Sequence, residues 1–160
     1  MLHKGFPPAL KGLAAQAAGL VHGDLSSALD DWQQAPPPSD ARLHALAAML
    51  ALSPAETIAL ALAFAADTDV AAGRALAWLQ APRRDSHPTL GLVAALESLR
   101  GIPVAQTLAS LLDGAALAGE LLLLDAQGRA LPDARLRLPQ PLLAALAGGE
   151  GRWPGVQLGD

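Results

Sequence analysis

The segment Ser53-Pro54-Ala55-Glu56 places the strongest local constraint on how this chain folds. A serine accepts hydrogen bonds from the first turn of a helix, and proline suits the first helical position. A glutamate three residues after the serine can bond back to the serine amide, which completes a capping box. These residues predict that a helix begins at Pro54.

The residues after this cap are apolar in an unusual order. Ile58, Leu60, Leu62 and Phe64 alternate with alanines, and alternation by itself favours a strand. The cap and the alanines, which have the highest helix propensity, favour a helix instead. On a helix, Ile58 and Leu62 point one way, and Leu60 and Phe64 point nearly the opposite way. We therefore predict a central helix that is buried on two sides.

Aspartates mark the ends of the neighbouring helices. Asp40 is expected to cap the helix that precedes the central one. Asp67-Thr68-Asp69 is expected to end the central helix and to cap the next, over residues 70–80. Trp78 lies among leucines in that helix, so we expect it in the core.

Two shorter helices are predicted further along. Thr89 is expected to cap a short helix, and Pro103 to be the first residue of a helix that runs to Leu112. On the second helix we expect an apolar face and a polar face; the first holds Val104, Leu108, Leu111 and Leu112, and the second holds Gln106, Thr107, Ser110 and Asp113.

A hairpin and a last helix follow. The apolar segment 120–125, the turn 127–129 and the alternating segment 134–138 predict two antiparallel strands, and residues 142–147 predict a helix. Helix, helix, hairpin and helix over residues 89–147 is the plan of a winged-helix unit. The predicted fold class is mainly α: a helical bundle with a winged-helix-like unit that carries a small two-stranded β-hairpin.

The chain is predicted to divide at its proline and glycine runs. Residues 1–34 are expected to form an N-terminal helical arm, 35–39 a Pro-rich linker, 40–148 the helical and winged-helix-like domain, and 149–160 a Gly-rich tail. Trp32 and Trp153 are expected to pack the arm and the tail onto the domain; an exposed partner site is the alternative.

Composition excludes several classes of function. The chain has no cysteine, which excludes disulfides and thiolate metal sites and suits a cytoplasmic protein. No apolar run approaches the roughly 20 residues of a membrane helix. The four histidines lack metal-ligand spacing, and GxxxxGKS/T occurs nowhere. We expect no catalytic residue, no cofactor and no metal in this chain, and therefore not an enzyme.

Nucleic-acid binding is the alternative function. The formal net charge is −4, and the helix from Pro103 to Leu112 has no lysine or arginine with which to neutralise phosphates. The hairpin does offer Arg129, Arg135 and Arg137. A winged-helix transcriptional regulator would bind DNA through these three arginines, whereas a solvated strand face is the simpler reading.

The order of short motifs resembles one known family. Leu52-Ser53-Pro54-Ala55-Glu56 and an apolar helix are followed by Pro88-Thr89-Leu90-Gly91-Leu92, then the hairpin, then Leu136-Arg137-Leu138-Pro139 and a last helix ending in Gly148. This series resembles the winged-helix-like region that precedes the ATPase module in AAA+ ATPases encoded with phage-tail-like contractile injection systems. The resemblance covers residues 43–148.

The chain departs from the family pattern in several places. Ala55 stands where the family usually has phenylalanine, and Pro139 and Gln140 stand where it has an acidic pair. An aromatic-rich segment before the hairpin and the Walker motifs are both missing. The resemblance implies a non-catalytic N-terminal domain that helps an ATPase engage its assembly or substrate. Its partner would be its own C-terminal ATPase module or an injection-system component, and no catalytic residue carries over.

Overall fold

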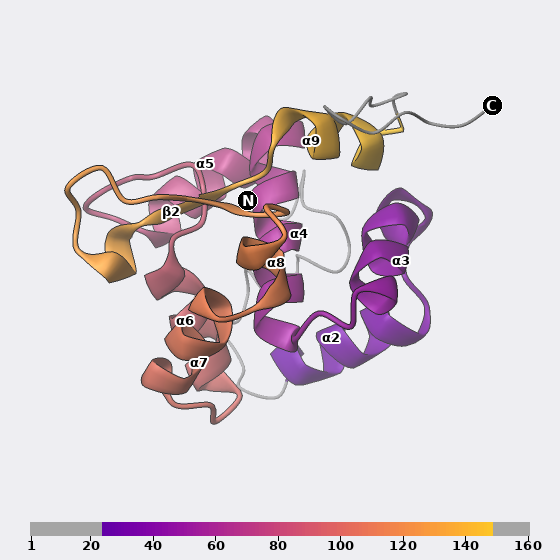
Figure 1. The fold of residues 1–160 in the computed structure, drawn as a ribbon, viewed down its shortest axis with the longest axis horizontal. Coiled ribbons are helices and arrows are strands. Elements are labelled where there is room, and N and C mark those ends of the chain that lie inside the picture. Colours follow the sequence, from indigo (N-terminus) through magenta and orange to yellow (C-terminus); the bar gives the residue numbers. More distant parts are fainter. Residues whose placement is uncertain (1–23, 149–160) are drawn as a thin grey trace.

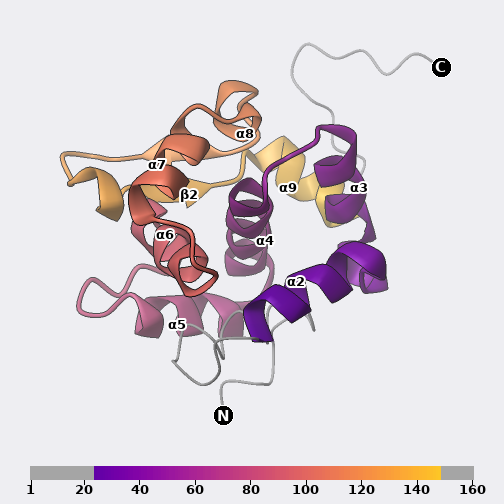
Figure 2. The ribbon, with the colours of Figure 1, turned by 90° about the horizontal axis from the view of Figure 1, so that it is seen from below.

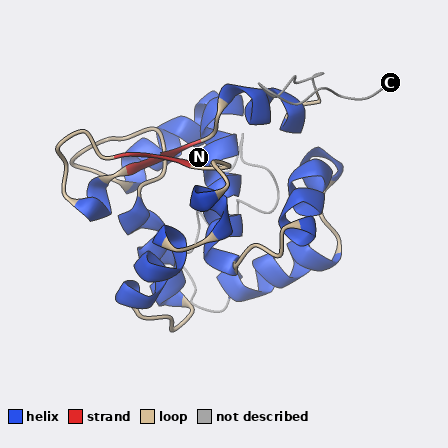
Figure 3. Ribbon diagram, viewed as in Figure 1, coloured by secondary structure: helices blue, strands red, loops and turns tan. Residues whose placement is uncertain are grey.

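The structure, a computed structural model, describes residues 24–148, which form several helices and one small sheet at one side of the molecule (Figure 1, Figure 3). The prediction of a mainly helical fold with a two-stranded hairpin is confirmed. No helix in this range is long and apolar enough to cross a membrane.

The central helix, α4 (Pro54–Thr68), begins where the capping box predicts. Ser53 N–H donates to Glu56 Oε2 at 2.8 Å, and Glu56 N–H donates to Ser53 Oγ at 3.2 Å. Buried side chains lie on both sides of α4, including Ile58 and Leu60 at 1% exposure each. The other helices surround α4 in both views (Figure 1, Figure 2). The helix assignment and the two-sided burial are therefore confirmed.

The helices before α4 are α2 (Asp24–Gln34) and α3 (Ala41–Met49), joined through the 3-10 turn η1 (Pro38–Asp40). Trp32 is buried, as expected, and its Nε1 donates to Asp40 Oδ2 at 3.0 Å. Asp40 is the N-cap residue of α3, as expected, but its side chain makes no capping hydrogen bond, because its buried carboxylate accepts from the indole instead.

The domain boundaries stay a prediction. Leu29 and Trp32, in the described part of the expected arm, belong to the same core as α4. Residues 1–23 of that arm and Trp153 lie outside the described residues.

The next helix, α5 (Val70–Leu79), is capped by Asp69, whose carboxylate accepts from Ala71 N–H at 2.8 Å, as expected. The placement of Trp78 in the core is wrong: its side chain is 61% exposed. Helix α5 turns Ala72, Ala75 and Leu76 inward, and small residues allow its backbone to lie close to α4. The large indole is on the other side.

The winged-helix-like unit consists of α6 (Leu90–Leu99), α7 (Val104–Leu112), a short α8 (Ala115–Ala118), β1 (Leu123–Asp125), the turn η2 (Leu131–Asp133), β2 (Arg135–Arg137) and α9 (Gln140–Leu146). Strands β1 and β2 are antiparallel, with Leu124 opposite Leu136. On its other side β2 pairs with the residues that precede α6, through a bridge between Thr89 and Arg135. This bridge attaches the hairpin to the start of α6.

The structure differs from the predictions in several places, and β1 and β2 are shorter than the segments 120–125 and 134–138. Pro103 is the cap of α7 rather than its first residue, and α9 begins at Gln140 rather than Leu142. Helix α8 was not expected. Its Ala116 N–H donates to Glu56 Oε1 at 2.9 Å, so a carboxylate on α4 supplies the acceptor that its own short sequence lacks.

Candidate functional site

The helix that a winged-helix DNA reader would place in the major groove is α7, and it carries no basic residue. Val104 and Leu112 are exposed, at 49% and 40%, and Gln106 is exposed beside them. The expected faces are wrong in part, because Thr107 is buried with Leu111 whereas Val104 and Leu112 face outward. Packing against α6 and α4 therefore leaves α7 with an uncharged and partly apolar outer side.

Two of the three hairpin arginines converge on one buried carboxylate. Arg129 Nη1 donates to Asp85 Oδ2 at 2.7 Å, and Arg135 Nη1 lies 3.9 Å from Asp85 Oδ1. Arg135 Nη2 also donates to Asp125 Oδ2 at 3.0 Å. Asp85 is 8% exposed, so this cluster is partly shielded from solvent. Arg137 is exposed and makes no ion pair within the described residues.

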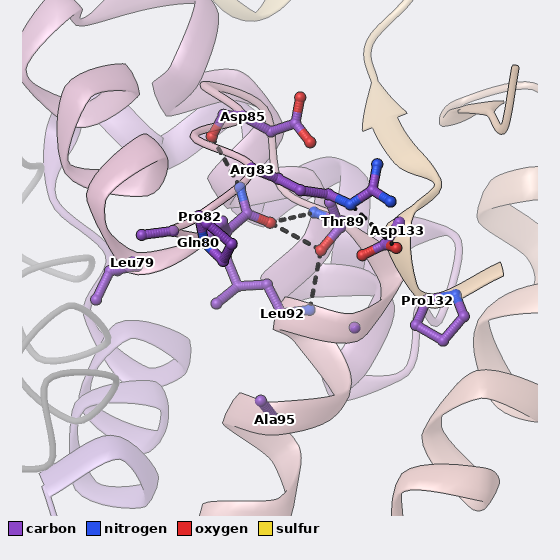
Figure 4. A pocket seen from close by; sticks show the side chains of 12 residues that line it. Leu79, Gln80, Pro82, Arg83, Asp85, Thr89, Leu92, Ala95, Pro132 and Asp133 are labelled. Carbon is purple, nitrogen blue, oxygen red and sulfur yellow. Dashed lines mark hydrogen bonds and ion pairs between the residues drawn. The ribbon is translucent and has the colours of Figure 1, made fainter. Parts of the chain in front are cut away.

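The side chain of Gln80, directly after α5, closes the loop over residues 81–88 (Figure 4). Its Nε2 donates to the backbone carbonyls of Asp85 and His87, at 2.9 and 2.8 Å. Its Oε1 accepts from the backbone N–H and the hydroxyl of Thr89, at 3.0 and 2.7 Å. The Thr89 hydroxyl also caps α6, as predicted. Gln80 therefore uses both donors and both acceptor positions of its amide.

A cavity of about 370 Å³ lies beside this amide, between the end of α5, the start of α6 and η2 (Figure 4). At its edge Arg83 Nε lies 3.2 Å from Asp133 Oδ2. Its apolar lining comes from Leu79, Pro82, Leu92, Ala95 and Pro132, among others. Because Gln80 and Thr89 bond to each other and to backbone, the cavity presents apolar walls and an ion pair.

The described histidines make contacts of other kinds. His44 Nε2 lies 2.8 Å from Gln33 O, and its ring meets Trp32 edge-on at 5.1 Å. His87 Nε2 lies 2.7 Å from Asp67 Oδ1. In the part of the chain that the structure describes, no group of three or more His, Cys, Asp or Glu residues is placed to hold a metal ion.

Asp85→Asn is expected to loosen the hairpin, because the amide keeps the shape of the carboxylate but loses the charge that two guanidinium groups share. We expect the free energy of unfolding to fall by about 1 kcal/mol, with faster amide hydrogen exchange in β2. The control is Asp30→Asn, on the exposed side of α2. Equal stability of the two variants would show that the cluster contributes nothing to the fold.

Gln80 and Asp85 are the important polar residues that sequence reasoning missed. A glutamine at a helix end and an aspartate in a polar loop are typical of exposed positions. Arg83 and Arg84 directly precede Asp85 in the sequence, but Arg83 pairs with Asp133. The arginines that use Asp85 come instead from the hairpin, more than forty positions further along.

No protein-family model, curated protein or solved structure matches the chain.

Proposed function

We propose that the chain is a non-catalytic, N-terminal protein-interaction and regulatory domain of an AAA+ ATPase, and that it helps the ATPase engage its assembly or its substrate. The observation that carries the proposal is the outer side of α7, where Val104 and Leu112 are exposed and no basic residue occurs. Burial of apolar side chains drives protein association, whereas duplex binding depends on cations that neutralise phosphates.

The ion pairs of the hairpin support the same proposal. A phosphate would have to compete with Asp85 for Arg129 and with Asp85 and Asp125 for Arg135. Only Arg137, of the three arginines expected for the alternative, is exposed and without such a partner among the described residues. The proposal of an ATPase rests on the resemblance of residues 43–148 to the region that precedes the ATPase module in the AAA+ family. The proposed partner is the chain's own C-terminal ATPase module or an injection-system component.

The experiment that tests the proposal is to read the coding sequence beyond the codon for Asp160. We expect the frame to continue into GxxxxGKS/T followed by an acidic Walker B strand. The long protein, with and without residues 1–148, is then compared for ATP hydrolysis and for co-purification of an injection-system component. A frame that ends after Asp160 contradicts an ATPase module on the same polypeptide.

A winged-helix transcriptional regulator is the second candidate, favoured by the exposed Arg137 on the hairpin. We expect no saturable binding of a fluorescent duplex of about 30 base pairs below roughly 100 µM protein in about 50 mM salt, because even non-specific DNA binding needs several free cations. Fluorescence anisotropy measures this. Salt-dependent binding that Arg137→Ala weakens would establish the alternative, and this variant leaves the Asp85 cluster intact.

A further inference from the structure

The small sheet has two edges, and a side chain closes one of them. The segment that precedes α6 pairs with β2, where Leu136 N–H donates to Pro88 O at 2.8 Å. On the side away from β2, His87 O and Thr89 N–H bond to the amide of Gln80, at 2.8 and 3.0 Å. Gln80 therefore supplies the donor and the acceptor that one more strand would supply, so this edge is protected.

The opposite edge is formed by β1, and it is open at Leu124. In antiparallel pairs the backbone groups of successive residues point alternately to the two sides of a strand. Leu136 directs its N–H to the segment before α6, so its neighbours Arg135 and Arg137 bond to β1. Leu124 lies opposite Leu136 and therefore directs its own N–H and C=O away from β2. No described residue bonds to either group.

The side chains along this edge are also uncovered. Leu123 is 43% exposed and Leu124 is 37% exposed. Proteins usually protect an edge strand with lysine, proline or a covering segment, and β1 holds neither lysine nor proline. An N–H and a C=O that point the same way from one residue are matched by the backbone of another extended strand. The β1 edge, as we call Leu123, Leu124 and Asp125, is therefore a site for a β-strand.

A second copy of β1 fits the β1 edge in hydrogen bonding. Two antiparallel copies related by a two-fold axis set Leu124 opposite its symmetry mate, and each Leu124 N–H then donates to the C=O of the other. The two exposed Leu124 side chains lie next to each other on the same side of the sheet. We propose that two copies of the chain pair through their β1 edges and join their hairpins into one four-stranded antiparallel sheet.

The charges beside the β1 edge are complementary in the same arrangement. Asp125 of the second copy comes opposite Leu123, on the face of the sheet that also carries Arg137. Two strand spacings separate Arg137 from that aspartate, about 10 Å between Cα atoms, which the two side chains can bridge. Arg137 makes no ion pair within the described residues, and Asp125 Oδ1 accepts no hydrogen bond from them. The two-fold axis forms this pair twice, which favours a second copy over an unrelated extended peptide.

The pairing is expected to be weak and to stop at two copies. It adds two backbone hydrogen bonds and covers three strand residues of each chain, which places the interface below about 1,200 Å². The contact uses the same surface on both copies, so the second copy closes it. The inference does not depend on an ATPase module.

Sedimentation velocity of the full chain, from about 10 µM to about 1 mM, tests the pairing. The wild type is expected to pass from monomer to dimer with no larger species. Leu124→Pro removes the outward N–H and should weaken association at least about tenfold, whereas the fold is kept because proline is tolerated on an edge strand whose N–H faces solvent. Its control is Ala130→Pro, because Ala130 has a φ of −60° and its N–H bonds to no described residue. The control should dimerise like the wild type.

Two further variants keep the Leu124 N–H. Leu124→Lys sets two like charges opposite each other and should also prevent the pairing, with Leu131→Lys, at an exposed position on η2, as its control. Arg137→Ala removes one partner of both ion pairs and is expected to weaken association about threefold. Hydrogen exchange identifies the strand directly, because the Leu124 amide should exchange at least about twofold more slowly at about 1 mM than at about 10 µM.

Three results overturn the inference. The first is a wild-type chain that stays monomeric over the whole range, which leaves the β1 edge to an extended peptide. The second is a dimer that Leu124→Pro retains; Leu124→Lys replaces the proline variant if that variant does not fold. The third is a dimer in which exchange of the Leu124 amide does not depend on concentration. All of these results leave the reading-frame test of the ATPase proposal unaffected, so the two ideas fail separately.

Discussion

Glu56→Ala is expected to lower the free energy of unfolding by about 3 kcal/mol. Glu56 is 4% exposed, and its carboxylate accepts from two backbone N–H groups, that of Ser53 at 2.8 Å and that of Ala116 at 2.9 Å. Truncation leaves both donors without an acceptor where water has little access, and each such group costs about 1–3 kcal/mol. Urea denaturation measures the loss, which corresponds to a melting temperature lower by roughly 10 °C.

Three further variants sharpen this experiment. Glu56→Gln keeps the side-chain volume and one acceptor oxygen, so about half of the effect is expected. Gly114→Ala should approach the effect of Glu56→Ala, because a Cβ at Gly114 would overlap the Glu56 carboxylate. Asp30→Asn, on the exposed side of α2, should leave stability unchanged. If Glu56→Ala lowered the free energy of unfolding by less than about 1 kcal/mol, Glu56 would not stabilise the starts of both α4 and α8.

Gln80→Glu is expected to lower the free energy of unfolding by about 2–3 kcal/mol, although it only replaces the side-chain NH2 group with an oxygen. At neutral pH a carboxylate cannot donate, so the carbonyls of Asp85 and His87 would face an oxygen instead of the Nε2 donor. The acceptor side, toward Thr89, is retained. Because Leu136 N–H donates to Pro88 O at 2.8 Å, its hydrogen exchange reports on the same loop and should become faster.

The matched control is Gln106→Glu, since Gln106 is exposed on α7 and the chemical change is the same. It should alter stability by no more than about 0.5 kcal/mol. Gln80→Ala removes all four hydrogen bonds and is expected to be at least as destabilising as Gln80→Glu. If Gln80→Glu were as stable as the control, the amide would not be what closes the loop.

The starts of α4, α5 and α6 could be predicted because their signals are local. Ser53, Asp69 and Thr89 accept from N–H groups two or three residues further along, so the spacing of a few side chains defines each cap. The same holds for β2, in which alternating residues place Leu136 in the core and Arg135 and Arg137 on the other side. Such features depend only on residues that are close in the sequence, so the sequence is sufficient to predict them.

The faces that the helices bury depended on contacts with distant elements. Trp78 looked like a core residue among leucines, but small residues on the other side of α5 let that side lie against α4. On α7, Thr107 is buried while Val104 and Leu112 are exposed, because the orientation is set by α6 and α4. Hydrophobic periodicity predicts that a helix has a buried side, and it predicts the direction of that side poorly when apolar residues occur all round.

The sequence by itself determined where α4, α5 and α6 start, that residues 54–68 form a helix rather than a strand, and that a hairpin precedes the last helix. Only the tertiary structure decided which groups the buried polar side chains bind. Glu56 reaches Ala116, sixty residues away, and Asp85 reaches Arg129 on the hairpin. The physical reason is that a buried polar atom needs a hydrogen-bond partner, and packing can bring that partner from a distant part of the chain. The spacing of neighbouring residues does not predict which distant residue this will be.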